Sequence, residues 1–401
     1  MQKYFGFIVA LDDYSQFYRA NKELIENISK KFEKIYVINV YRLKLRDKSG
    51  IIKNDDIFPK NFQCINFLSS KDFLNFFKNK FFVAIQYLDK NPDFFRIFFL
   101  IKLAKIKNIM IMNLGNFGLS RTVDFNLKYI FAFKHYYSKG FYKLFRILTI
   151  LNIFPKIDIL FETNTELINN INNGYLKKIE RKFPFLKLSY FQKIEKVNSL
   201  FYDQYLTNKT IENHENKKNI LLVDVPIDHP DRISREGPVE ESIKESYYRD
   251  LSHFLTKLSE ILNMDVVVGL HPSSKNVDQF FTKFNLSKKR TIDLVPDSEI
   301  IVVTHSSLIS MLALYKKKII SIRSKYMGKF HTELSNNYSN SLNLFTLNID
   351  KELNFEKEFI LNKLELAIKE YDTHIRNYVK VDGENLSHDT IIKKIKNTYF
   401  F

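Results

Sequence analysis

Two short stretches of this chain decide its fold: Val-Val-Val-Gly-Leu-His-Pro-Ser-Ser at residues 266–274 and Ile-Ile-Val-Val-Thr-His-Ser-Ser-Leu at residues 300–308. Each begins with a run of β-branched residues, which is typical of a strand buried in a parallel sheet. Each run leads into a histidine that hydroxyl residues follow. Ligands of open α/β sheets bind outside the carboxyl ends of the strands. We therefore expect both stretches to supply polar side chains to one ligand site.

The residue types at these two strand ends suit an anion. His271 precedes Pro272, which favours an extended or turn backbone and a ring that points out of the end of the sheet. Ser306 and Ser307 precede an expected helix over 308–315, and a helix N-terminus binds phosphate. Taken singly, the serines are explained as a helix cap and the histidine as a structural residue. Together they predict a nucleotide site, whose candidates are His271, Pro272, Ser273, Thr304, His305, Ser306 and Ser307.

A third polar loop, at residues 224–231, follows the first strand of the same half. Its candidates for nucleotide or acceptor contacts are Asp228, His229 and Asp231, which stand too near one another to converge readily on one metal ion. Arg232 and Arg235 follow as phosphate partners, although solvated surface charges explain them equally well. A Gly/Asn-rich loop in the first half adds Asn113 and Asn116, for which a plain turn is the alternative.

Apolar strand-like runs alternate with amphipathic stretches through both halves of the chain, as in βαβ units. We expect strands at 4–11, 35–40, 63–68, 82–87, 109–112, 157–162, 220–225, 265–270, 300–303 and 318–322, and helices that include 277–284 and 356–376.

The polar, Lys/Asn-rich stretch 206–219 lacks apolar periodicity and favours a linker. The predicted fold class is α/β with two Rossmann-like lobes, 1–205 and 220–380, a tail at 381–401, and the ligand site in the cleft between the lobes.

Two carboxylates, Asp12 and Asp13, follow the first strand of the first lobe. A carboxylate at a strand end is a candidate general base for an acceptor hydroxyl. Because adjacent side chains diverge, at most one of the two is expected to act in this way. The alternative is an acidic residue that stabilises the start of the next helix.

Composition narrows the class of protein and its partners. The single cysteine, Cys64, excludes a disulfide framework and a cysteine metal cluster, and it fits a reducing compartment. The formal charge of +17 favours an anionic partner such as a nucleic acid, an anionic lipid or a phosphorylated substrate, although a general bias toward lysine accounts for it equally well. We find no secretory signal and no run of ~18 apolar residues, so we expect a cytoplasmic protein.

Residues 125–155 interleave aromatic and basic side chains, and no acidic residue occurs between Asp124 and Asp158. This pattern predicts contact with an anionic membrane surface, at the inner face of the cytoplasmic membrane. A core-packed helix with snorkelling lysines is an equal alternative. A stacking platform for single-stranded nucleic acid is less favoured, because no nucleic-acid-binding module surrounds the segment. Nucleic acid is therefore not an expected partner.

Several common enzyme motifs do not occur in the sequence. It contains no G-x-x-x-x-G-K-[ST], no G-x-G-x-x-G after the first strand, no G-x-S-x-G and no H-E-x-x-H. The sequence therefore disfavours a kinase, P-loop NTPase, dinucleotide oxidoreductase, α/β-hydrolase or zincin.

The second half resembles bacterial glycosyltransferases of the GT-B fold. Within that fold it is most similar to the group that uses CMP-activated acidic sugars, the sialyltransferases and Kdo transferases of surface polysaccharide assembly. The motifs that carry the resemblance are His271-Pro272 and Ser306-Ser307, within residues 220–325. The acidic motif that holds the catalytic base in several of these families is not present as such, and Asp12-Asp13 is its positional counterpart.

The resemblance implies a glycosyltransferase that moves a sugar from a nucleotide donor, CMP-linked by preference, to a surface-glycan or glycolipid acceptor. It implies that His271, Ser306 and Ser307 hold the nucleotide phosphate, that Asp12 or Asp13 deprotonates the acceptor, and that no bound metal or other cofactor is needed. Two alternatives remain open: a CDP-polyol phosphotransferase of the teichoic-acid type, and a non-catalytic nucleotide- or glycan-binding assembly protein.

Overall fold

The computed structural model of the chain describes most of its 401 residues. The described residues are 3–45, 53, 55–88, 94–112, 144, 147–173, 181–182, 191–209, 218–271, 274, 276–306, 308–351, 354–381, 383 and 385–400.

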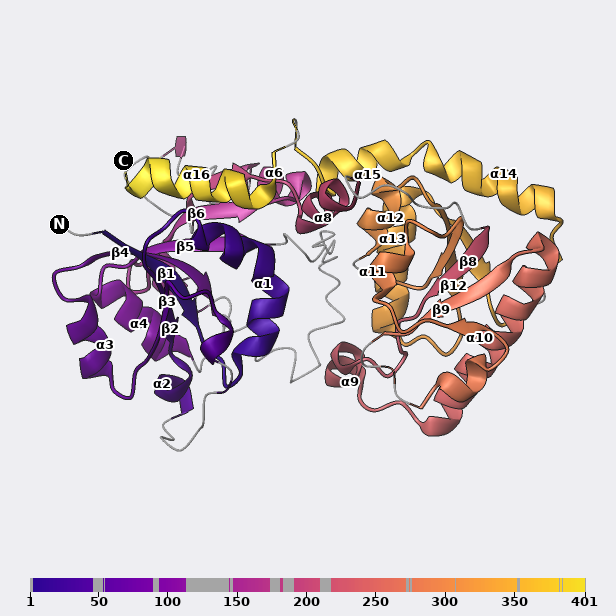
Figure 1. Cartoon of the computed structure of the whole chain (residues 1–401), viewed down its shortest axis with the longest axis horizontal. Helices are drawn as coiled ribbons and strands as arrows, with labels where there is room; N and C mark the ends of the chain where they lie inside the picture. The colour runs from indigo at the N-terminus through magenta and orange to yellow at the C-terminus, as the bar shows by residue number, and fades with distance from the viewer. Residues whose placement is uncertain are drawn as a thin grey trace. The chain divides into compact units, whose positions relative to one another are not determined.

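The described residues form two compact units, each built on its own sheet (Figure 1). Unit 1 contains the described residues before 113, those from 144 to 198 and those from 381 onward, and unit 2 contains those from 199 to 380. The described residues of the expected linker, 206–209 and 218–219, therefore belong to unit 2, and the described residues of the expected tail contribute to unit 1. Aromatic packing explains that return of the chain, because Phe400 lies 5.3 Å from Phe32 and 6.4 Å from Phe5, between ring centroids.

Unit 1 contains a seven-stranded sheet in the order β3-β2-β1-β4-β5-β6-β7, with parallel pairing throughout. Its strands are β1 (Lys3–Val9), β2 (Ile35–Asn39), β3 (Phe62–Asn66), β4 (Phe81–Tyr87), β5 (Lys107–Met112), β6 (Ile157–Glu162) and β7 (Phe191–Lys196). Its helices are α1 (Tyr14–Ser29), α2 (Tyr41–Leu45), α3 (Ser70–Phe77), α4 (Phe95–Leu103), α6 (Thr165–Asn173) and α16 (Ser387–Tyr399), with a 3₁₀ turn at Asp55–Ile57.

Unit 2 contains a six-stranded parallel sheet in the order β10-β9-β8-β11-β12-β13. Its strands are β8 (Asn219–Val223), β9 (Asp265–Gly269), β10 (Asn285–Leu286), β11 (Ile300–Val303), β12 (Lys318–Arg323) and β13 (Phe345–Asn348). Its helices are α8 (Leu200–Lys209), α9 (Pro230–Glu236), α10 (Glu241–Leu262), α11 (Thr291–Leu294), α12 (Ile309–Leu314), α13 (Lys329–Leu342), α14 (Lys357–Ile368) and α15 (Tyr371–Tyr378), with a 3₁₀ turn at Asp278–Phe281.

Alternation along the central strand places side chains in two separate cores. Leu222 of β8 packs in the cluster that contains the buried face of α10, whereas Leu221 and Val223 pack with α12 and α15. Helices therefore cover both faces of the sheet. This is why its strands read as continuous apolar runs rather than as alternating ones.

The order of the second sheet reverses beside β8. The chain runs from β8 to β9 and β10 on one side, and then crosses to β11, β12 and β13 on the other. In such a sheet the ligand crevice lies at the carboxyl ends of the strands that flank the reversal. In unit 2 these are the ends of β8, β9 and β11. The predicted α/β class with two parallel-sheet lobes is confirmed.

Candidate functional site

Three neighbouring strands of unit 2 end in ionisable side chains. Asp224 follows β8, His271 lies two residues after the end of β9, and Thr304 and His305 follow β11. Because the three strands are parallel and adjacent, these residues lie together at the carboxyl end of the sheet. They lie beside the point at which the order of the strands reverses.

Four histidines gather at this end of the sheet, and we call them the histidine cluster: His229, His271, His305 and His331. The rings of His229 and His271 lie 5.2 Å apart between centroids. The rings of His305 and His331 lie 4.2 Å apart. The two pairs also interact electrostatically, because the charges of His229 and His271 help to lower the pKa of His305.

Two members of the histidine cluster are buried with a ring nitrogen that has no partner among the described residues. His305 is 7% exposed and its Nδ1 makes no hydrogen bond there, and the same holds for Nε2 of His331, which is 1% exposed. The hydroxyl of Thr304, beside His305, is also buried without such a partner. Buried polar groups are nearly always hydrogen-bonded in folded proteins, so these atoms need a partner that the described residues do not supply.

Burial keeps these two histidines uncharged at neutral pH. It lowers the pKa of His305 well below its ordinary value, with a smaller effect from the charge of His331. It also lowers the pKa of His331 to about 3, and the charge of Arg232 adds to the effect. A neutral imidazole carries one N–H donor and one acceptor nitrogen. The pair therefore offers hydrogen-bond donors, rather than fixed positive charges, to an anionic ligand.

Asp224 is a buried carboxylate at the end of the central strand. Its Oδ2 accepts a hydrogen bond of 2.6 Å from the hydroxyl of Ser274, and its residue is 3% exposed. Burial raises the pKa of this carboxyl to about 6, opposed by hydrogen bonds from Ser274 and from the backbone of His271. The residue was not a candidate from sequence, although its position directly after a buried strand is the same signal that selected His271.

Two basic side chains lie nearby, and both are largely buried. Arg232 on α9 donates to the carbonyl oxygen of Ile227 at 2.8 Å, and its charge contributes to the low pKa of His331. Lys244 on α10 is 7% exposed and pairs with Asp228 at 3.0 Å, so this predicted loop residue is engaged in an ion pair. The other two predicted residues of this region, Asp231 and Arg235, also lie on α9.

A backbone N–H in the first turn of α13 donates to a carboxylate from another helix. Gly328 precedes α13 and provides no side-chain cap, and the N–H of Phe330 donates instead to Oε1 of Glu236 on α9. The other oxygen of Glu236 lies 3.3 Å from Nε of Arg232. A Cβ at position 328 would overlap the ends of the Glu236 and Arg232 side chains, so glycine lets both side chains lie where they do. Because His331 lies on the same turn, this carboxylate is held close to the histidine cluster.

Of the predicted serines, Ser306 acts in the turn before α12. Its hydroxyl accepts from the N–H of Leu308 at 3.2 Å, and its carbonyl accepts from the N–H of Ile309 at 3.1 Å. This is the turn-capping role that the sequence left as an alternative. Five other candidates lie outside the described residues, namely Asn113, Asn116, Pro272, Ser273 and Ser307.

The two predicted bases in unit 1 have different environments. Asp13 is the N-cap of α1, and its carboxylate accepts from the N–H of Ser15 at 2.7 Å. The side chain of Asp12 is exposed, and its carbonyl accepts from the N–H of Lys53 at 2.9 Å. The helix-stabilising alternative therefore describes Asp13, because its carboxylate is committed to the helix. Asp12 is the better candidate for a base.

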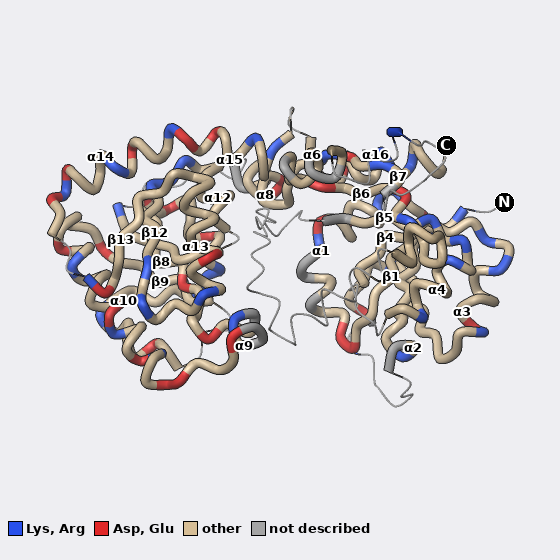
Figure 2. The backbone as a smooth tube through the Cα atoms, turned by 180° about the vertical axis from the view of Figure 1, so that it is seen from behind, with Lys and Arg blue, Asp and Glu red and all other residues tan. Residues whose placement is uncertain are grey.

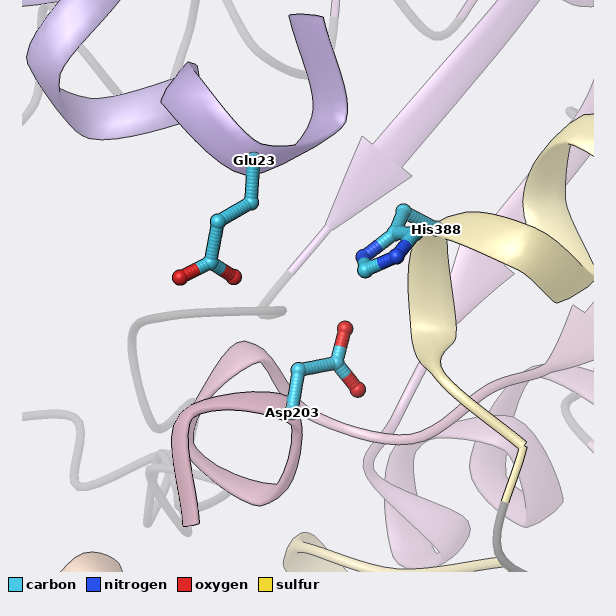
Figure 3. A group of neighbouring side chains, drawn as sticks. All are labelled: Glu23, Asp203 and His388. Atoms are coloured by element: carbon cyan, nitrogen blue, oxygen red, sulfur yellow. The ribbon is translucent and has the colours of Figure 1, made fainter. Parts of the chain in front are cut away.

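Another set of ionisable side chains was not predicted from sequence. Figure 3 shows Glu23 on α1 and His388 on α16, which belong to unit 1, and Asp203 on α8, which belongs to unit 2.

None of the helices in the described part of the chain is both long and apolar enough to span a bilayer. Most of the predicted basic aromatic segment 125–155 falls outside that part; Leu144 and residues 147–155 are described.

No family model matches this sequence, and no curated protein matches it. Among solved structures, the chain is similar to the UDP-GlcNAc 2-epimerase from Methanocaldococcus jannaschii, with a TM-score of 0.50 and 13% identity over 99% of this chain and 100% of that one. It is also similar to the wall teichoic acid polymerase TagF, with a TM-score of 0.48 and 12% identity over 99% of this chain and 90% of that one. A third similar structure is the UDP-GlcNAc 2-epimerase from Neisseria meningitidis, bound to UDP-GlcNAc. Its TM-score is 0.46, with 13% identity over 99% of this chain and 100% of that one.

The likeness to the Methanocaldococcus enzyme concerns the fold. It confirms the GT-B-like class, with two α/β units that each contain a parallel sheet. The resemblance to enzymes that use CMP-sugars stays a prediction.

Proposed function

We propose that this protein is a GT-B glycosyltransferase whose unit 2 binds a nucleotide-sugar donor. The observation that carries the proposal is the pair His305 and His331, two buried neutral histidines with ring nitrogens that have no partner in the described structure. They lie where a parallel sheet reverses its order, which is where nucleotides bind in sheets of this kind. A nucleotide phosphate supplies the acceptor oxygens that these rings need.

The proposed site would stabilise the negative charge that develops on the departing nucleotide. During transfer the bond between the anomeric carbon and the phosphate oxygen breaks, the acceptor oxygen bonds to that carbon, and negative charge collects on the departing nucleotide. Donors already held in a water-poor site stabilise such charge without reorganising. The histidine cluster supplies these donors, and Arg232 supplies a permanent positive charge beside them. We propose that the carboxylate of Asp12 accepts the proton of the acceptor hydroxyl.

The finer parts of the proposal come from the resemblance. The donor is CMP-linked, the acceptor is a bacterial surface glycan or glycolipid, and the reaction needs no bound metal. The acceptor is reached from the inner face of the cytoplasmic membrane, to which residues 125–155 were predicted to bind. Because UDP-GlcNAc is the substrate in the name of the Methanocaldococcus enzyme, uridine nucleotides belong in the same test.

A thermal-shift panel of CMP, CDP, UMP, UDP and GDP tests the donor class, because a ligand of the folded state raises the melting temperature with its concentration. We expect CMP to give the largest shift. We expect His271→Ala to weaken CMP binding by roughly 10- to 150-fold, the equivalent of one hydrogen bond to a charged group. The control is His253→Ala, an exposed histidine on α10. Unchanged CMP affinity in His271→Ala would contradict the proposal.

Product analysis tests the reaction. With a CMP-sugar and a glycan acceptor, we expect a new glycoside and free CMP. A phosphodiester formed from a CDP-polyol would instead identify the phosphotransferase alternative. Binding of nucleotide with turnover of neither donor would identify the non-catalytic one.

The carboxylate of Glu236 gives a separate prediction. It places a negative charge beside Arg232 and on the first turn of α13, so it repels an incoming phosphate. We expect Glu236→Gln, whose amide oxygen still accepts from Phe330, to bind CMP and inorganic phosphate about tenfold more tightly, by calorimetry. Glu240→Gln removes the same charge just before α10 and is the control. Equal affinities in both variants would show that Glu236 only caps α13.

A further inference from the structure

Exposed apolar side chains concentrate in one part of unit 1. Of the eleven large hydrophobic residues that are exposed in the described structure, six lie between positions 99 and 153. Their exposed fractions run from 40% for Leu144 to 62% for Leu151. We call these six the apolar patch: Phe99, Leu103, Leu144, Ile147, Leu151 and Ile153. Isolated exposed hydrophobic residues are ordinary, but a concentration of this kind marks an interaction surface.

The two segments that form the apolar patch pack against each other. Lys102 on α4 donates to Oδ1 of Asn152 at 2.5 Å. The ring of Phe154 lies 5.3 Å from that of Phe95 and 5.9 Å from that of Phe98, between centroids. Residues four apart lie on the same face of a helix. Phe99 and Leu103 therefore share a face of α4, and Ile147 and Leu151 share a face of the neighbouring helical turn.

The exposure of α4 is unusual because its inner face is already apolar. Ile97, Phe98, Leu100 and Ile101 are buried in the core of unit 1. Phe99 and Leu103 are exposed on the same helix, beside Arg96 and Lys102, so the core of unit 1 does not cover all of its apolar side chains.

The rim of the apolar patch is basic. Arg96 and Lys105 are exposed at the two ends of α4, and Lys102 lies between them. The sequence has no acidic residue from 94 to 112 or from 144 to 157. Figure 2 accordingly shows α4 without an acidic segment. The flanking acidic residues are Asp93, which lies outside the described residues, and Asp158, whose side chain is 11% exposed and pairs with Lys107 at 3.7 Å.

The apolar centre and basic rim favour an anionic bilayer over a second copy of the chain as the partner. A second copy of the chain would bring two basic rims together, which opposes docking. A bilayer with anionic headgroups offers an apolar interior to the centre and negative charge to the rim, and each basic residue near such a surface strengthens binding by about fivefold. We propose that the apolar patch is the surface through which unit 1 binds an anionic lipid bilayer; this extends the membrane contact proposed above for residues 125–155 and does not depend on the nucleotide site.

The absence of tryptophan from the sequence allows a site-specific test with the full chain. Leu151→Trp places a fluorescent probe in the apolar patch. Leu366→Trp places one on α14 of unit 2, where leucine is 57% exposed, against 62% for Leu151. With vesicles of phosphatidylcholine and phosphatidylglycerol, we expect a blue shift for Leu151→Trp alone. With phosphatidylcholine vesicles we expect neither probe to shift. A shift of both probes, of neither, or equally with both vesicles would overturn the proposal.

Introducing negative charge into the apolar patch completes the test. In vesicle sedimentation, we expect Ile147→Glu/Leu151→Glu to bind at least tenfold more weakly than wild type, and the matched Phe359→Glu/Leu366→Glu to bind like wild type. All four positions are exposed, and thermal unfolding monitors the fold of each variant. Equal sedimentation of the two variants would contradict the proposal. A change in molar mass by light scattering in the first variant, without a loss of sedimentation, would assign the apolar patch to a second copy.

Discussion

Replacing His305 by leucine is expected to abolish most nucleotide binding without destabilising the fold. The residue is 7% exposed, and its Nδ1 has no hydrogen-bond partner among the described residues. Removing an unpartnered buried polar group costs no internal hydrogen bond, and an apolar replacement of similar size is neutral or stabilising. The expected loss is therefore in nucleotide affinity, not in stability. We expect the Kd for CMP to rise by roughly 10- to 150-fold.

His374 provides a matched control in the same unit. It is equally buried, and burial lowers its pKa to about 3, as for His331. Its Nε2 lies 2.7 Å from the hydroxyl of Ser310, and its Nδ1 lies 3.1 Å from that of Ser341. His374→Leu leaves the buried hydroxyl of Ser310 without this partner, at a cost of about 1–3 kcal/mol, whereas the hydroxyl of Ser341 still donates to the carbonyl oxygen of Tyr338. We expect lower stability and an unchanged Kd for CMP.

The two variants are to be compared by calorimetry with CMP and by urea unfolding. The proposal requires opposite outcomes: binding lost with stability kept for His305→Leu, and stability lost with binding kept for His374→Leu. If His305→Leu is destabilised as much as His374→Leu and still binds CMP, His305 is a structural residue and the proposed site is wrong.

The sequence predicts the parts of this site that come from strands. The expected strand over 300–303 is confirmed as β11, and the expected 265–270 as β9, which ends at Gly269. Buried parallel strands have a distinctive composition, because both faces are covered. A residue directly after such a strand must lie at the carboxyl edge of the sheet. His271 and His305 could therefore be placed from local sequence alone.

The parts that come from helix packing could not be predicted in this way. His331 and Glu236 reach the site because α13 and α9 pack together, and the local sequence of neither helix records that contact. Gly328 is the only local signal, and a glycine before a helix has many explanations.

Tertiary contacts also override two helix predictions. The single helix expected over 356–376 is wrong: α14 ends at Ile368 and α15 begins at Tyr371. The sequence has no glycine or proline there, but Tyr371 is fully buried and its hydroxyl donates to the carbonyl of Lys317 at 3.1 Å. The helix expected over 277–284 is a 3₁₀ turn, because Asn285 and Leu286 pair with β9 directly after it.

Asp224→Asn is expected to stabilise the protein at neutral pH and to leave it unchanged in acid. Burial raises the pKa of Asp224 from 3.8 to about 6 in the folded protein. Between these two values the folded protein holds a proton that the unfolded chain has released, so the free energy of unfolding falls as the pH rises. The total loss is about 3 kcal/mol, complete above about pH 6, because each unit of pKa shift corresponds to about 1.4 kcal/mol.

Asparagine removes this loss because it does not ionise, and its amide oxygen still accepts from Ser274. We therefore expect Asp224→Asn to unfold with a free energy roughly 3 kcal/mol above wild type at about pH 8, and equal to it below about pH 4. His271, His305 and His331, whose pKa values burial lowers, are present in both proteins, so their effect on stability largely cancels in the difference. Urea unfolding of both proteins between about pH 4 and about pH 8 measures this difference in the free energy of unfolding. A difference that does not vary with pH would show that Asp224 ionises as it does in water, and would remove the buried carboxylate from the description of the site.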